Sequence, residues 1–171
     1  MSSQVKGTCV ATNPRKFKAR LVAKGFSQRE GIAYFKVFSL VVKHTSIRAL
    51  LVVVAAKDLE LEQMDVKSAF LNGFIAEEVY VEQPLTFEDH AFPNHVFKLN
   101  KALYGLKQAS RAWYERLINF LIENNFTRGN VEKTLFIKKK SSDILLVQIY
   151  VDGIIFGSTN VSLYEEFAKL M

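Results

Sequence analysis

The sequence has little of the chemistry that marks secreted or membrane-spanning proteins. Its 171 residues include a single cysteine, Cys9, which cannot form an internal disulfide and so gives no sign of an oxidising compartment. The first residues, MSSQVKGTCVATNPRKFK, lack the apolar core of a signal peptide. The longest apolar run, Ala49 to Ala56, is far shorter than the roughly 20 residues that span a bilayer. We therefore expect an intracellular protein with no membrane partner.

The charge of the chain is unevenly distributed. Hydrophobic residues make up 49% and charged residues 23%, as in a globular protein. Residues 1–50 carry a net charge of +9, residues 51–100 carry −6 and residues 101–171 carry +3. A basic N-terminal segment of this kind is typical of a surface that meets phosphates, although a solvated basic surface fits the charge equally well.

The hydrophobic periodicity predicts an α+β fold. Alternation predicts strands over 17–25, 59–66, 79–84, 95–99, 134–138, 144–151 and 154–157. Helical spacing predicts helices over 45–57, 111–124 and from about 162. The first helix, with Thr45 or Ser46 as its N-cap, is apolar nearly all round, so we expect it to be buried. The elements show no βαβ period, which favours an α+β fold over a doubly wound parallel sheet.

Two carboxylates occupy unusual positions. Asp65 follows an alternating strand, and Asp152 lies between two apolar runs in LVQIYVDGIIFG. If these strands lay side by side, the two acids would meet and could hold Mg²⁺, which prefers carboxylate oxygens together with substrate phosphates. Spacing alone leaves two other interpretations open: Asp65 as a helix N-cap, and Asp152 as the first residue of an Asp-Gly hairpin turn.

Five sequence blocks indicate a family. KARLVAKGF, QMDVKSAFLNG, VYVEQP, KALYGLKQASRAWY and QIYVDGIIFG occur in this order from residue 17 onward. Together they resemble consecutive motifs of the Ty1/copia-type retrotransposon reverse transcriptase. The resemblance implies a polar tail over 1–16 outside the family, and partial reverse-transcriptase fingers and palm over 17–171.

The resemblance implies an RNA-directed DNA polymerase shaped like a right hand. The palm would be an antiparallel sheet backed by helices, and the thumb would be absent from this chain. Asp65 and Asp152 match the catalytic aspartates that bind two Mg²⁺ ions, with the Val66 carbonyl as a further ligand. The implied partners are an RNA or DNA template-primer and a deoxynucleoside triphosphate, with integrase and RNase H as neighbours if the chain is part of a Pol polyprotein.

The resemblance also implies a nucleotide-binding group. Phe70 matches an aromatic side chain that rejects ribonucleotides, and Arg20 and Lys24 match a basic strand that holds the triphosphate. Taken alone, Phe70 is more typical of a hydrophobic core.

A loop in the same family lies against the incoming nucleotide and the template. Tyr104, Gly105 and Lys107 fall in it. Taken alone, Gly105 is typical of a turn and Lys107 of a solvated surface.

The chain departs from the family at one position of the hairpin. Gly153 stands where the family has a second Asp in Tyr-Val-Asp-Asp. Losing this charge removes electrostatic stabilisation, and a glycine at the hairpin tip would loosen Asp152. We therefore expect at most residual polymerase activity. Two alternatives remain: a non-catalytic nucleic-acid-binding module that uses the basic segment 15–48, and a translated pseudogene product without function.

Overall fold

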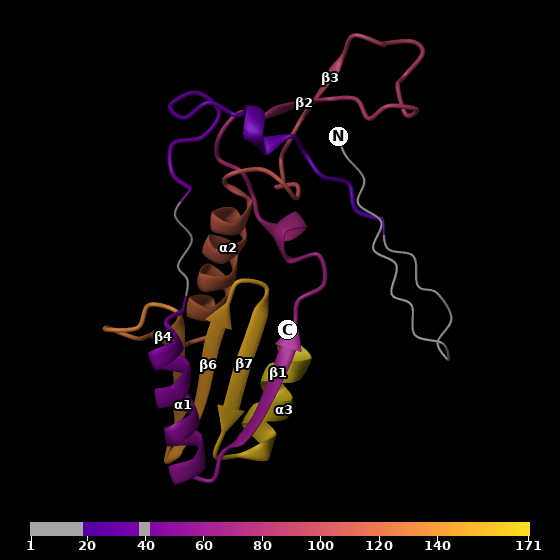
Figure 1. Cartoon of the computed structure of the whole chain (residues 1–171). Helices are drawn as coiled ribbons and strands as arrows, with labels where there is room; N and C mark the ends of the chain where they lie inside the picture. The colour runs from indigo at the N-terminus through magenta and orange to yellow at the C-terminus, as the bar shows by residue number, and fades with distance from the viewer. Residues whose placement is uncertain (1–18, 38–41) are drawn as a thin grey trace, which may run out of the picture. The chain divides into compact units, whose positions relative to one another are not determined.

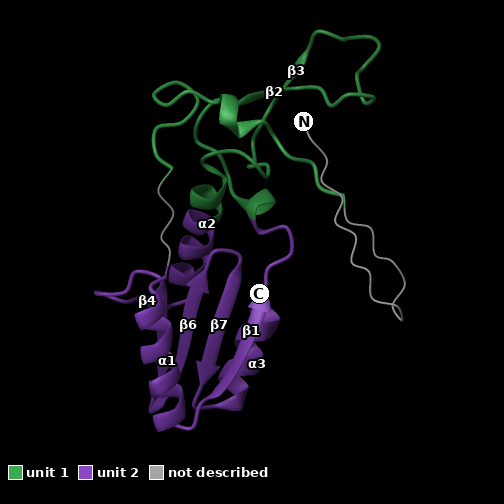
Figure 2. Ribbon diagram, viewed as in Figure 1, with its two compact units in different colours: residues 1–38, 70–113 green, residues 39–69, 114–171 purple. Residues whose placement is uncertain are grey.

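The structure, a computed structural model, describes residues 19–37 and 42–171. It divides into two compact units: unit 1 comprises residues 1–38 and 70–113, and unit 2 comprises residues 39–69 and 114–171 (Figure 2). The predicted polar tail over 1–16 and the first two residues of the predicted strand over 17–25 lie outside the described residues. Across the described ranges, every helix is too short or too polar to cross a membrane.

Unit 2 is built on a five-stranded antiparallel sheet with the strand order β1-β7-β6-β5-β4 (Figure 1). The strands are β1 (Glu60–Asp65), β4 (Thr127–Arg128), β5 (Leu135–Lys140), β6 (Asp143–Tyr150) and β7 (Gly153–Ser158). The predicted strands in these regions are confirmed, as is the mixed helix-and-sheet class. β5 extends two residues beyond the predicted strand over 134–138, so Lys139 and Lys140 belong to the strand.

Helices cover both faces of this sheet (Figure 1). On one face, Leu50 of α1 (His44–Ala56) packs with Leu146 and Ile155. On the other, the rings of Phe156 and of Phe167 in α3 (Val161–Leu170) lie 4.9 Å apart. Adjacent residues of β7, at positions 155 and 156, thus contact opposite helices, because side chains alternate along a strand. Both faces are apolar, which explains the continuous hydrophobic runs of β6 and β7.

Two expectations for α1 were wrong. Within the helix only Leu50 is buried, and Val52 is 67% exposed, because the helix contacts the sheet through a single stripe. The N-cap residue is Lys43, which makes no side-chain cap. Ser46 lies inside the first turn and donates its hydroxyl hydrogen bond to Glu132 Oε2 at 2.5 Å.

This contact begins a polar chain that ends inside the sheet. Thr134 Oγ1 donates to Glu132 Oε1 at 2.7 Å, and Gln148 Nε2 donates to Thr134 Oγ1 at 2.6 Å. Thr134 and Gln148 are almost completely buried, so each polar atom needs the partner that this chain provides. The hydrogen bonds from Ser46 and Thr134 lower the pKa of Glu132 below its ordinary value of 4.5.

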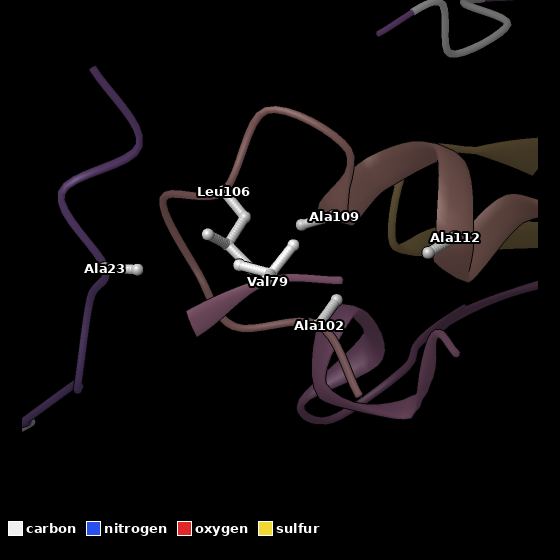
Figure 3. Packing of buried hydrophobic residues seen from close by; sticks show 6 residues of the cluster. All are labelled: Ala23, Val79, Ala102, Leu106, Ala109 and Ala112. Carbon is white, nitrogen blue, oxygen red and sulfur yellow. The ribbon is translucent and has the colours of Figure 1, made fainter. Parts of the chain in front are cut away.

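Unit 1 contains few regular elements. It holds the short 3-10 helix η1 (Gly25–Ser27), the antiparallel pair β2 (Tyr80–Glu82) and β3 (Val96–Lys98), and the beginning of α2 (Ala109–Glu123). A second 3-10 helix, η2 (Ala69–Asn72), starts at the last residue of unit 2. The core of unit 1 is a cluster of small side chains (Figure 3): Ala23, Val79, Ala102, Leu106, Ala109 and Ala112.

The strand predicted over 17–25 is absent from its described part, residues 19–25. Val22 forms one isolated parallel bridge with Tyr104, and the 3-10 helix begins at Gly25. The helix predicted over 111–124 is confirmed as α2.

The polar chain in unit 2 should make stability depend on pH. Glu132→Gln should lower the free energy of unfolding by about 1 kcal/mol at neutral pH, since hydrogen bonds to the charged carboxylate are lost. Because folding lowers the pKa of Glu132, this stabilisation is present above pH 4.5 and is lost as the pH falls through the folded-state value. Urea unfolding followed by circular dichroism at several pH values measures it. A difference between the wild type and Glu132→Gln that persists undiminished in acid would contradict this account.

Candidate active site

Backbone pairing brings the two predicted catalytic carboxylates to the same end of neighbouring strands in the sheet of unit 2. β1 and β7 are antiparallel neighbours, and Asp65 lies directly opposite Gly153 in their register. The backbone N–H of Val66 donates to the carbonyl of Asp152 at 3.0 Å, which extends the pairing by one step. The strand contact that the periodicity could not establish is therefore present. Asp65 and Asp152 end up on neighbouring chain segments although 86 positions separate them.

The hairpin turn lies one residue earlier than the Asp-Gly pattern indicates. Tyr150 pairs with Gly153, so the two turn residues are Val151 and Asp152. Gly153 is the first residue of β7 rather than a turn residue, so the expectation that it occupies the hairpin tip was wrong. The strained position is Val151, whose φ of 57° is unusual for a β-branched residue. Such a conformation costs about 1–3 kcal/mol and is held by the strands on either side.

Both carboxylates are free to bind a cation. Asp65 and Asp152 are exposed, and neither side chain makes a hydrogen bond or ion pair with a described residue. Asp65 therefore caps no helix within the described chain, and that interpretation of it was wrong. The Val66 carbonyl accepts a hydrogen bond from Ala69 N–H at 3.3 Å, which leaves it a second lone pair.

This donor set fits magnesium. It consists of hard oxygen atoms, and Mg²⁺ commonly takes one or two carboxylates and completes its octahedron with water and phosphate. Within residues 19–37 and 42–171, no group of three or more His, Cys, Asp or Glu side chains is positioned to hold a metal.

The backbone at Gly153 accepts a side chain. A Cβ built there would lie 3.4 Å from the Tyr150 carbonyl oxygen and 4.0 Å from that of Met64, which are ordinary contacts. Gly153 is also absent from the residues with positive φ. Residues directly opposite each other on antiparallel strands share a face, with Cβ atoms about 4.5–5.5 Å apart. An aspartate at position 153 would thus place its carboxylate beside that of Asp65.

Three of the predicted nucleotide-binding residues meet in unit 1. The Arg20 guanidinium carbon lies 4.3 Å from the centre of the Tyr104 ring. The Phe70 ring meets the Tyr104 ring edge to face, with centres 5.3 Å apart. Phe70 is half-buried and also packs against the small-residue cluster, so it has both a core contact and a partly open face. Arg20 is exposed, which leaves its N–H groups available to an anion.

Glycines allow two backbone segments to approach closely beside this group. The N–H of Ala23 donates to the Tyr104 carbonyl at 2.7 Å. Gly105 has a φ of +91°, and a Cβ there would lie 2.2 Å from the Ala23 carbonyl oxygen. A Cβ at Gly25 would lie 1.8 Å from the Gly105 carbonyl oxygen. Gly105 is a turn residue, and this close approach also requires it to be glycine.

Two glutamines that the motifs did not single out hold the same loop. Gln28 Oε1 accepts from the Lys107 backbone N–H at 2.9 Å, and Gln28 Nε2 donates to Gln108 Oε1 at 3.1 Å. Gln108 is buried and donates in turn to the Ala33 carbonyl at 3.1 Å. Gln108 lies within the KALYGLKQASRAWY block, but no pattern in the sequence marks it as buried. The side chains of Lys107 and Lys24 are exposed and make no hydrogen bond or ion pair with a described residue.

Comparison with known proteins identifies the family. A family profile described as "Reverse transcriptase (RNA-dependent DNA polymerase)" matches residues 7–171. The chain belongs to the reverse transcriptase family. The resemblance to copia-type reverse transcriptases that the motifs indicate is thereby confirmed.

Several curated relatives are similar to this reverse transcriptase chain. The "Retrovirus-related Pol polyprotein from transposon RE1" of Arabidopsis thaliana is 44% identical over 86% of the chain. The corresponding polyprotein from transposon TNT 1-94 of Nicotiana tabacum is 45% identical over 82%. The chain spans only 10% and 11% of the length of these two relatives. No solved structure matches it.

The close approach at Gly105 predicts a large steric cost for substitution. Gly105→Ala should lower the free energy of unfolding by about 2 kcal/mol or more, since it combines a left-handed φ with a backbone clash. Gly31→Ala is a matched control, because Gly31 has a φ of +79° and nothing within 4 Å of a Cβ. It should cost only about 1 kcal/mol. Urea unfolding followed through the fluorescence of Trp113, the only tryptophan, measures both. Equal costs would contradict the clash.

Proposed function

We propose that the chain is the fingers-and-palm part of the reverse transcriptase of a retrotransposon Pol polyprotein. Unit 2 supplies the palm and unit 1 the fingers. The reaction is the templated addition of a deoxynucleotide to a primer paired with RNA or DNA. The observation that carries the proposal is the register that sets Asp65 opposite position 153, with Asp152 in the adjoining turn.

Asp65, Asp152 and the Val66 carbonyl would hold magnesium at this end of the strands. When bound, Mg²⁺ activates the primer hydroxyl and neutralises charge on the leaving phosphate. The protein's own contribution is positional. The paired strands β1 and β7 fix Asp65, and the strained two-residue turn fixes Asp152, so no reorganisation of the backbone is needed when charge develops.

The fingers would bind the nucleotide through the Arg20–Tyr104–Phe70 group. The Arg20 guanidinium carries the positive charge and the fork of donors that suit a triphosphate. Tyr104 holds Arg20 by a cation–π contact and supports Phe70 edge to face. Phe70 is the proposed barrier to a 2′-hydroxyl. Lys24 and Lys107 are exposed cations that would add to the attraction for phosphate.

Gly153 should impair this chemistry without disturbing the fold. The position carries no side chain, so one negative charge is missing from a site that must balance the charge of Mg²⁺. Removal of one preorganised electrostatic group from an active site costs about 10²-fold or more in rate. We therefore propose residual activity at most.

Restoring the carboxylate should restore catalysis. Gly153→Asp should raise the rate of primer extension on an RNA template with Mg²⁺ by about 10²-fold or more. Val161→Asp is the matched control, since it adds the same charge at an exposed position at the start of α3 and should leave the rate unchanged. Asp65→Asn in the Gly153→Asp background should abolish the gain. Robust extension by the unmodified chain would show the proposed impairment to be wrong.

Metal binding can be measured apart from turnover. Calorimetric titration with Mn²⁺ as a substitute for Mg²⁺ should show weak binding to the unmodified chain and about tenfold or more tighter binding to Gly153→Asp, because a third carboxylate adds an oxygen ligand and a negative charge. Asp65→Asn and Asp152→Asn should each weaken it. Binding that is unaffected by both substitutions would place the metal elsewhere.

A further inference from the structure

The outer edge of β2 is open. The Leu99 N–H donates to the Val79 carbonyl at 2.9 Å, which makes positions 79 and 99 a hydrogen-bonded pair. Hydrogen-bonded and non-hydrogen-bonded pairs alternate in an antiparallel ladder. Tyr80 and Glu82, which pair with Lys98 and Val96, are therefore non-hydrogen-bonded positions. Their backbone N–H and C=O groups point away from β3, and they make no hydrogen bond with a described residue.

A cleft of about 720 Å³ lies along this edge, entirely within unit 1. Five consecutive residues of and around β2, Val79 to Gln83, line it, together with Leu106 and with Ala23 to Gln28 in part. Its volume lies within the range of small-ligand pockets, about 300–1,000 Å³.

One wall of the cleft is preorganised. Gln83 Nε2 donates to the Phe92 carbonyl at 2.8 Å and to the His95 carbonyl at 2.9 Å. Gln83 Oε1 accepts from the Asp89 N–H at 2.6 Å. The Phe92 and His95 rings stack with their centres 4.7 Å apart. The loop between β2 and β3 thus keeps its shape without an occupant, which reduces the entropy cost of binding one.

The chemistry of the cleft selects its occupant. Leu85 and Val96 line it and are 77% and 51% exposed, so it offers apolar surface. Glu82 and Glu88 also line the cleft, and neither carboxylate has an ion-pair partner among the described residues. The lining contains two carboxylates and a single lysine, Lys24. Two free carboxylates repel a phosphate backbone and attract a basic side chain.

We propose that the β2 edge binds an extended peptide of alternating apolar and basic residues, which adds a third strand to the β2–β3 pair. Outward N–H and C=O groups at Tyr80 and Glu82 supply the strand hydrogen bonds, which is the general mode of strand addition to a sheet edge. Glu82 and Glu88 take the basic side chains, and Leu85 takes an apolar one. The proposed catalytic carboxylates belong to unit 2, whereas Lys24, which the proposed function assigns to the nucleotide phosphates, also lines this cleft.

Fluorescence anisotropy with a fluorescein-labelled (Val-Lys)₄ peptide tests the proposal on the full chain. We expect saturable binding at about 0.15 M salt, where long-range attraction is screened. The (Val-Glu)₄ peptide should not bind. The (Pro-Lys)₄ peptide keeps the charge but cannot extend the ladder, and it should bind about tenfold more weakly or worse. Equal binding of (Pro-Lys)₄ would overturn strand addition.

Protein variants separate the backbone contribution from the charge. Glu82→Gln removes the carboxylate, and Glu82→Pro removes the outward N–H as well without touching a β2–β3 hydrogen bond. We expect Glu82→Pro to bind at least about fivefold more weakly than Glu82→Gln, which corresponds to one lost amide hydrogen bond. Lys98→Pro is the matched control: its N–H points outward from β3, Lys98 does not line the cleft, and binding should be unchanged.

Two outcomes would overturn the proposal. One is equal binding by Glu82→Pro and Glu82→Gln when circular dichroism shows both variants to be folded. The other is displacement of the peptide by a short oligouridylate at the same site, with tighter binding by the RNA than by the peptide, which would make the cleft a nucleic-acid surface. Gln83→Met, which removes the three hydrogen bonds that hold the loop, should weaken peptide binding while leaving Mn²⁺ binding unchanged.

Discussion

The antiparallel pairing of β1 with β7 is the constraint on which the candidate active site depends. It unites a strand from the first half of the chain with the second strand of a hairpin near its end. A shift of one residue in this register would turn Asp65 to the opposite face of the sheet, because side chains alternate along a strand. Packing at the start of β1 anchors this register: Leu59, which directly precedes the strand, is buried with Leu50 of α1 and Leu146 of β6. The position of Asp65, the proposed catalytic acid, is thus set by packing several residues away.

Unit 1 reaches its geometry by another route. Its core consists mainly of alanines, which provide little apolar area for burial. Close backbone approach takes the place of bulky packing, with Gly25 and Gly105 in mutual contact range and Gln28 and Gln108 bonded across the same segments. Such a unit tolerates few changes at its glycines. It presents Tyr104 and Arg20 from a backbone held mainly by hydrogen bonds.

The sequence predicted the strands of the hairpin and the helix α2 because their signals are local: uninterrupted apolar runs in one case, and helical spacing in the other. It misplaced the turn because Asp-Gly is a strong turn signal. The observed turn puts Val151 at a positive φ, which is unfavourable for a β-branched residue and is held in place by the paired strands. It overestimated the burial of α1 because hydrophobicity does not say how many neighbours a helix has. The helix has one apolar contact stripe, centred on Leu50.

The candidate site could be predicted as a set of residues but not as an arrangement. Family motifs selected Asp65 and Asp152, yet their proximity depends on long-range pairing that no local pattern contains. Gln28 and Gln108 were missed for a similar reason, since their partners lie about eighty positions away along the chain. The open edge of β2 likewise depends on which of its residues bond to β3, a property of the register alone.

The space at Gly153 has a consequence for how a reverse transcriptase with this hairpin could lose activity. Its backbone pairs with Tyr150 and with Asp65 whether or not a side chain is present, and a Cβ meets no clash. Exchange between glycine and aspartate at this position therefore changes the charge of the site while leaving the hairpin intact. A copy with glycine and a copy with aspartate would therefore share the same backbone pairing at the end of β7.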